Sequence, residues 1–117
     1  MNQTLTDKKC VPCEGGIQPL TAEEMKKLTP QVPGWRVVPV EKTSRTMNTL
    51  QKTMTFKNFR QAMAFLRLVE EQAEAEGHHP DFCVHYNRVD FTLWTHAIGG
   101  LHENDFILAA KIDNLAG

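Results

Sequence analysis

The fold class follows from residues 57–95, which read KNFRQAMAFLRLVEEQAEAEGHHPDFCVHYNRVDFTLWT. In the first half of this stretch, apolar residues recur at helical spacing with charged residues opposite them: Phe59, Ala62, Met63, Leu66, Val69 and Ala73. This spacing predicts an amphipathic helix over residues 57–76. Gly77 is placed to end the helix, since glycine readily adopts the left-handed conformation of a helix C-cap.

The second half of the stretch changes to a period of two, which is typical of a strand. The residues that would share the inner face of this strand alternate from position 89: Val89, Phe91, Leu93 and Thr95. Residues 82–86 form a second short run, and the Asn87-Arg88 pair between the two runs is a turn candidate. The pattern therefore predicts a β-hairpin after the helix.

The sequence before residue 57 predicts one short helix and two strands. Thr21 followed by Glu24 is a capping-box pattern, so a helix should run to about Leu28 before the prolines at positions 30 and 33. We expect two strands in the stretches rich in β-branched and apolar residues, at residues 35–40 and 46–56. The first strand should be cut short at Pro39.

After the hairpin, Gly99-Gly100 interrupts the chain, and residues 103–115 have the pattern of a last amphipathic helix. The order helix-strand-strand-helix-strand-strand-helix predicts an α+β fold, with a four-stranded antiparallel sheet and three helices packed on one face. We expect residues 20–117 to form this domain. Residues 1–19, rich in Cys, Pro and Gly near their end, are expected to form a flexible leader.

Composition narrows the class of protein. A chain of 117 residues with 41% hydrophobic content suits one compact domain. Its 13 Lys and Arg residues nearly balance 14 Asp and Glu residues and are scattered, so we expect no nucleic-acid ligand. No stretch approaches the roughly 20 apolar residues of a membrane span, and no signal peptide is evident, so a soluble, cytoplasmic protein is expected. The odd number of cysteines, 3, argues against a disulfide framework.

The histidines are the strongest candidates for chemistry. His78 and His79 follow Gly77, and Pro80 restricts His79 to extended conformations, so the pair is displayed on a stiff loop. His96 lies where the final strand ends. Because antiparallel pairing returns that end to the start of the preceding strand, we expect His96 to lie near Pro80 and the three imidazoles to converge.

Convergent imidazoles suit proton transfer, since near neutral pH one can donate a proton while another accepts one. Elimination of water needs both steps. Two other interpretations stay open at this point: histidines that only satisfy hydrogen bonds, and three histidines that hold a zinc ion with an open position. Cys10-Val11-Pro12-Cys13 also has the spacing of half a zinc site, but no second Cys-x-x-C follows.

One set of residues carries a specific motif: Glu74, His78-His79-Pro80, Tyr86, His96 and Asp105. In this spacing the chain resembles the pterin-4a-carbinolamine dehydratase family, and the likeness extends over about residues 20–115. The resemblance implies dehydration of 4a-hydroxytetrahydrobiopterin to quinonoid dihydropterin and water. It also implies a homodimer or homotetramer, no metal and no cofactor, and a functional link to an aromatic amino acid hydroxylase.

The resemblance further implies the site residues. His78, His79 and His96 would be catalytic, the substrate would be bound by residues 78–80 and by the segment Thr95, His96, Ala97 and Ile98, and Glu74, Tyr86 and Asp105 would have supporting roles. Two features depart from the family pattern. Phe82 stands where many members have tryptophan, and Ala97-Ile98-Gly99 replaces a more polar stretch. The resemblance therefore does not define the shape of the pocket.

Plainer interpretations of the supporting residues also remain. Asp105, three residues after His102, suits the N-terminus of the last helix, where free amides favour a carboxylate. Tyr86 could be a core aromatic residue with a satisfied hydroxyl, and Glu74 a solvated carboxylate. Other functions stay open as well: binding to a transcription regulator through a helix face with Phe65 and Leu68, or a pterin-related role in molybdenum cofactor metabolism.

Overall fold

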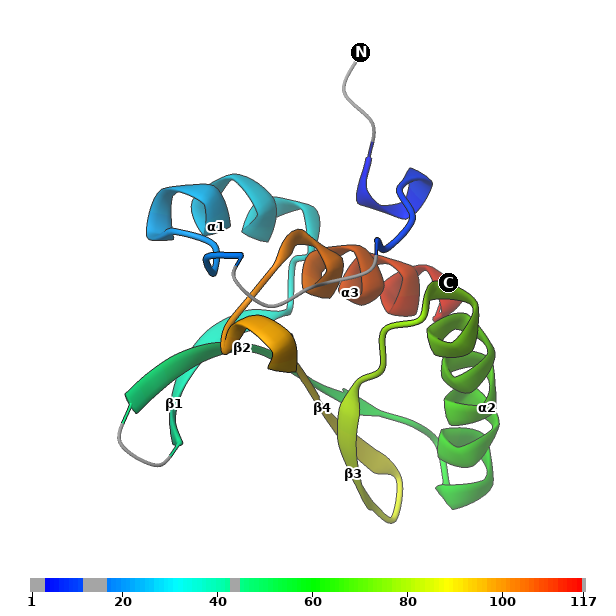
Figure 1. The fold of residues 1–117 in the computed structure, drawn as a ribbon. Coiled ribbons are helices and arrows are strands. Elements are labelled where there is room, and N and C mark those ends of the chain that lie inside the picture. The colour runs from blue at the N-terminus through cyan, green and yellow to red at the C-terminus, as the bar shows by residue number, and fades with distance from the viewer. Residues whose placement is uncertain (1–3, 12–16, 43–44, 117) are drawn as a thin grey trace.

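The computed structural model describes residues 4–11, 17–42 and 45–116, and it confirms the α+β fold (Figure 1). The helices and strands are α1 (Ala22–Leu28), β1 (Arg36–Lys42), β2 (Arg45–Thr55), α2 (Phe59–Glu76), β3 (Asp81–His85), β4 (Arg88–Leu93) and α3 (Glu103–Leu115). Short 3₁₀ turns lie at Leu5–Asp7, Thr29–Gln31 and His96–Ile98. All strand pairs are antiparallel, in the order β1-β2-β4-β3.

The helices lie on one side of the sheet, and the core fills the space between the two layers (Figure 1). The predicted inner face of β4 is buried throughout, since Val89, Phe91 and Leu93 are at most 1% exposed. Phe106 and Leu108 of α3 are fully buried against this core. The period-two pattern therefore identified the face of the sheet that the helices cover.

The helix boundaries agree with their sequence signals. α1 begins at the predicted capping box, in which the Thr21 hydroxyl accepts from the Glu24 amide and the Glu24 carboxylate accepts from the Thr21 amide. α2 ends at Gly77, which has a φ of 66°. This left-handed conformation, which costs glycine little, turns the chain sharply toward His78.

Three local predictions differ from the structure. β1 does not stop at Pro39 but continues to Lys42, because β1 is an edge strand and an edge tolerates a missing amide donor. The hairpin turn is formed by Tyr86 and Asn87 rather than by Asn87-Arg88, since His85 pairs with Arg88.

The apolar stripe of α2 is also shifted from the prediction. Phe59 and Met63 are 50% and 38% exposed, whereas Phe65 is only 7% exposed. The Phe65 ring packs against the rings of Phe56 and Phe91. Phe65 therefore belongs to the core and does not share an outward face with Leu68.

Residues 4–11, assigned to the leader from the sequence, contact the folded domain. Leu5 is 2% exposed within the core cluster, and the Lys8 ammonium lies 2.7 Å from the Glu103 carboxylate of α3. Cys10 is also buried. Cys13, the other half of the Cys-x-x-C spacing, lies outside the described residues.

Candidate active site

The loop after α2 places His78 against the start of α3. Gly77 reverses the chain, and the His78 amide still donates to the Ala73 carbonyl of the last turn. The His78 Nε2 atom lies 2.6 Å from Asp105 Oδ1, with 12% of the histidine side chain and none of the aspartate side chain exposed. A buried carboxylate in this position fixes the orientation of the ring.

Asp105 joins the His78 loop to the segment that carries His96. Its second oxygen, Oδ2, accepts from the Thr95 hydroxyl at 2.8 Å and from the His102 amide at 3.0 Å. The bond from His102 is part of a capping box at the start of α3, so the helix-terminus role predicted for Asp105 is confirmed. The same carboxylate therefore caps α3 and connects His78 with Thr95.

His79 forms a second histidine–carboxylate pair, which is exposed. Its Nε2 atom lies 2.6 Å from Glu74 Oε2, and the two side chains are 60% and 71% exposed. Glu74 therefore contacts the imidazole of His79. Because both groups are open to solvent, the pair orients His79 more than it stabilises the fold.

His96 lies in the 3₁₀ turn after β4, where its ring stacks on Trp94 at a centroid distance of 3.5 Å and an interplanar angle of 20°. The Trp94 indole donates to Asp81 Oδ2 at 3.1 Å. Since Asp81 directly follows Pro80, this bond connects the His96 ring to the His78–Pro80 loop. Sequence reasoning did not assign Trp94 a role, although its place on the polar side of the predicted strand, two residues before His96, was a usable signal.

The segment around His96 is closed into a small loop. Thr95 and Gly100 form an isolated bridge, and Gly99 has a φ of 66°. Within the loop, His96 and Ala97 are exposed whereas Thr95 and Ile98 are buried. Of the predicted binding segment, His96 and Ala97 are thus available to a ligand, while Thr95 anchors the loop on Asp105 and Ile98 packs inward.

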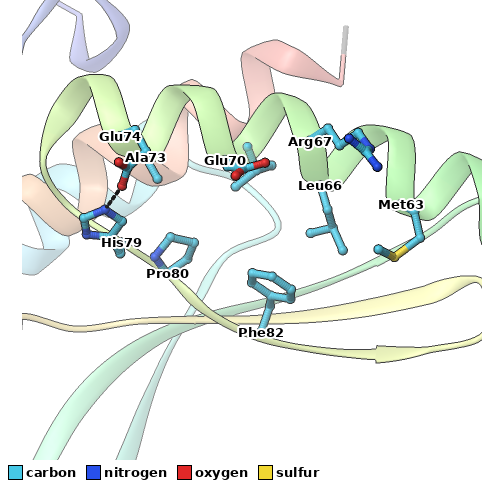
Figure 2. A pocket seen from close by; sticks show the side chains of 10 residues that line it. Met63, Leu66, Arg67, Glu70, Ala73, Glu74, His79, Pro80 and Phe82 are labelled. Carbon is cyan, nitrogen blue, oxygen red and sulfur yellow. Dashed lines mark hydrogen bonds and ion pairs between the residues drawn. The ribbon is translucent and has the colours of Figure 1, made fainter.

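A groove of about 530 Å³ lies between α2 and β3, and Figure 2 shows Glu74 and His79 pointing toward each other at one end of it. Pro80 also lies at this end. The remaining wall is largely apolar, with Phe82 facing α2 across the groove. His78 and His96 do not line this groove, so of the three predicted catalytic histidines it contains His79 alone.

Tyr86 lies away from the other predicted site residues. It lies in the β3–β4 turn, 66% exposed, whereas Asp81 at the other end of β3 leads to the histidine loop. His85, also on β3, is 55% exposed and 3.5 Å from Asp90.

The described parts of the chain contain no group of three or more His, Cys, Asp or Glu side chains placed to hold a metal ion. Within the same residues, no helix has both the length and the apolar character needed to cross a bilayer.

Comparison with known proteins gives consistent results. The sequence profile of the family described as "Pterin 4 alpha carbinolamine dehydratase" matches residues 18–115. A Methylococcus capsulatus protein named "Putative pterin-4-alpha-carbinolamine dehydratase" is 53% identical over 115 residues, covering 97% of this chain and 94% of that protein. A Rubrobacter xylanophilus protein of the same name is 45% identical over 111 residues, covering 95% and 97%.

Two solved structures are also similar. A Brucella melitensis protein described as a transcriptional coactivator/pterin dehydratase matches with a TM-score of 0.75 and 33% identity, over 86% of this chain and all 100% of that one. A pterin dehydratase-like protein described as a RuBisCO assembly factor in the alpha-carboxysome matches with a TM-score of 0.57 and 28% identity, over 73% and 92%.

Proposed function

Because the chain belongs to the pterin 4 alpha carbinolamine dehydratase family, we propose that it dehydrates 4a-hydroxytetrahydrobiopterin to quinonoid dihydropterin. The observation that carries this proposal is the buried carboxylate of Asp105, which binds His78 through one oxygen and Thr95, next to His96, through the other. The arrangement holds two imidazole-bearing segments in a fixed relation, as a reaction with two proton transfers requires.

The reaction breaks the C4a–O bond and the N5–H bond of the substrate and forms a C4a=N5 double bond. The departing hydroxyl takes a proton from a general acid and leaves as water, and the N5 proton passes to a general base. The net result is loss of one water, so no oxidant or reductant is consumed. Imidazole serves both roles near neutral pH.

His78 suits the role of base. Its ring already has a carboxylate partner at 2.6 Å, and that carboxylate stabilises the imidazolium that forms when the ring accepts the N5 proton. His96 is then the acid that protonates the departing hydroxyl. It is exposed, and the Trp94 ring fixes its orientation by stacking.

The groove between α2 and β3 offers a place for the substrate next to His79. Its volume of about 530 Å³ lies within the range of small-molecule sites, and Pro80 and Phe82 provide apolar contact area for a flat bicyclic ring. In this arrangement the Glu74–His79 pair orients the ring, and the reacting C4a–N5 edge extends beyond the groove toward His78 and His96, which do not line it. Tyr86 lies in the turn at the opposite end of β3 from the histidine loop, so we assign it no part in the reaction.

The decisive experiment is a stopped-flow dehydration assay with freshly generated 4a-hydroxytetrahydropterin. We expect His78→Ala and His96→Ala each to lower kcat by about a hundredfold to ten-thousandfold, the usual contribution of one positioned proton transfer. The matched control is His85→Ala, which removes an exposed histidine of β3 that lies 3.5 Å from Asp90. Turnover that persists in the His78→Ala/His96→Ala double variant would refute the histidine mechanism.

The zinc alternative is tested by elemental analysis of protein purified without added metal. Stoichiometric zinc that depends on His78, His79 and His96, together with loss of activity in chelator, would replace the metal-free mechanism with a metal-assisted one. We propose the metal-free enzyme because His78 and His79 each already bind a different carboxylate.

In metabolism, the proposed role is recycling of the pterin cofactor of an aromatic amino acid hydroxylase, with molybdenum cofactor metabolism as the alternative context.

A second candidate function, binding to a protein partner, is favoured by exposed apolar side chains on α2 and β3. Phe59, Met63, Leu68 and Phe82 are between 38% and 50% exposed. Phe59 and Leu68, which do not line the groove, suit the homodimer or homotetramer that the resemblance implies, since such an assembly would cover them. Light scattering of the purified protein tests this: a monomer at micromolar concentration would leave the surface free for a different partner.

A further inference from the structure

Residues 4–11 form an N-terminal strap that lies across the end of α2 and the start of α3. At one end of the strap, Leu5 is buried in the core, and at its centre the Lys8 ammonium pairs with the Glu103 carboxylate at 2.7 Å. These contacts fix the strap on α3. The next residues of the strap contact the two helix ends that carry His78 and Asp105.

The contact with α3 is made through Asn104, the residue before Asp105. The Asn104 side chain is 2% exposed, and its Oδ1 atom accepts from the Val11 amide at 3.0 Å. In return, Asn104 Nδ2 donates to the Val11 carbonyl at 2.7 Å. The Cys10 thiol donates to the Asn104 carbonyl at 3.6 Å. A two-way bond of this kind specifies both the position and the direction of the strap.

The contact with α2 is made through Glu76, two residues before His78. Glu76 Oε1 accepts from the Cys10 amide at 2.8 Å, and Oε2 accepts from Lys111 of α3 at 2.7 Å. Lys9 also donates to the Ala75 carbonyl at 3.3 Å. Cys10 and Val11 are adjacent in the chain, so one dipeptide connects the end of α2 to the start of α3.

We propose that the N-terminal strap is a positioning element of the active site, with Asn104 as its positioning residue. It sets the separation of the two helix ends and therefore the contact between His78 and Asp105. This inference rests on the proposed dehydratase function. Its physical basis is that proton transfer depends steeply on geometry, so a displacement of about 1 Å can cost on the order of a hundredfold in rate.

The first test is Asn104→Ala, which removes the two-way bond to Val11 and leaves Asp105 in place. We expect kcat to fall about tenfold or more while KM stays within about twofold, because the strap orients His78 and does not touch the substrate. In NMR spectra, the His78 Nε2 proton, strongly deshielded by the short bond to Asp105, should shift upfield and exchange faster with water. Met25→Ala is the control, since it removes a buried side chain of α1, whereas the hydrogen bonds and the ion pair that hold the strap go to α2 and α3. It should lower the melting temperature and leave kcat unchanged.

Release of the strap can be measured separately at Cys10. Burial raises the pKa of this thiol to about 12, so it should resist alkylation while the strap is docked. In Asn104→Ala, iodoacetamide should label Cys10 faster than in wild type, as read by peptide mass spectrometry. Val11→Pro, which removes the amide donor to Asn104 Oδ1 and leaves Asn104 itself in place, is the second variant if Asn104→Ala does not fold.

The outcomes separate the possible explanations. If Cys10 labelling shows that the strap is released in both variants while kcat and the His78 proton resonance match wild type, the strap only adds stability and the inference is wrong. If wild type itself does not turn over the carbinolamine, the proposed function fails. In that case the His78 resonance still reports whether the strap sets the contact with Asp105.

Discussion

At the scale of single residues, the carboxylate of Asp105 is the group on which most of the site depends. It is fully buried and receives hydrogen bonds from Thr95 and His102 in addition to its contact with His78. A buried charged group is tolerated only when it is satisfied in this way, because removal of its partners costs the full desolvation penalty.

We predict that Asp105→Asn separates catalysis from folding. The amide oxygen can still accept from Thr95 and His102, so the free energy of unfolding should fall by only about 1–2 kcal/mol. The amide nitrogen would face His78 Nε2 and favour the opposite tautomer, so kcat should fall by about a hundredfold or more. Urea denaturation and stopped-flow turnover measure the two effects. An Asp105→Asn protein with wild-type kcat would contradict the role given to His78 as base.

Sequence reasoning reached part of this site. The position of Asp105 three residues after His102 predicted a helix N-terminus, and the return of the hairpin predicted that the His96 segment lies near the His78 loop. The contact of Asp105 with His78 was not predictable, because nothing local in the sequence shows which carboxylate a histidine contacts. Glu74, for which the sequence leaves open a supporting role or a solvated carboxylate, contacts the imidazole of His79, which follows the turn at Gly77.

At the scale of elements, the β3–β4 hairpin shows where local patterns mislead by a single residue. The alternation of β4 fixed the inner face of the strand, since a slip by one position would expose Val89, Phe91 and Leu93. The alternation did not fix the position of the turn, because asparagine is common at both the first and the second position of a two-residue turn, so Asn87 suits either one. In the structure the positive φ falls on Tyr86, at 55°, and not on Asn87.

We predict that Tyr86→Gly stabilises the protein. Tyr86 is 66% exposed, so little buried area is lost, and glycine removes the strain of a positive φ at the first turn position. The gain in the free energy of unfolding should be about 0.5–1 kcal/mol, with the relief of strain partly offset by the greater chain entropy of glycine. Tyr86→Ala is the control, since it removes the same ring but keeps the strain. Thermal unfolding of the two variants gives the comparison, and equal stabilities would contradict the assignment.

At the scale of the whole molecule, Glu76 connects three parts of the chain that are distant in sequence. Its carboxylate binds the Cys10 amide of the strap, the Lys111 ammonium of α3 and the Gln72 amide within α2. Sequence analysis assigned residues 1–19 to a leader because Cys, Pro and Gly suggest a loop. The contacts of residues 4–11 depend on two polar partners, Glu76 and Asn104, that no hydrophobic pattern marks.

The stability of the molecule in acid should therefore depend on Glu76. Burial opposes its charged form, but the Lys111 ammonium and the Cys10 amide outweigh burial and lower the pKa of Glu76 below its ordinary value. A lowered pKa in the folded state means that the carboxylate stabilises the protein above its unfolded pKa of about 4.3, and that this contribution disappears as pH falls through the folded value.

We predict that Glu76→Gln lowers the free energy of unfolding at neutral pH and that its difference from wild type narrows as the pH falls below about 4. Urea denaturation across this range measures the difference, and Cys10 alkylation of Glu76→Gln at neutral pH reports whether the strap opens. A double-mutant cycle with Lys111→Met separates the ion pair from the bond to the Cys10 amide. If the difference from wild type stays constant with pH, the charge of Glu76 contributes nothing to stability, and the strap is held by its other contacts.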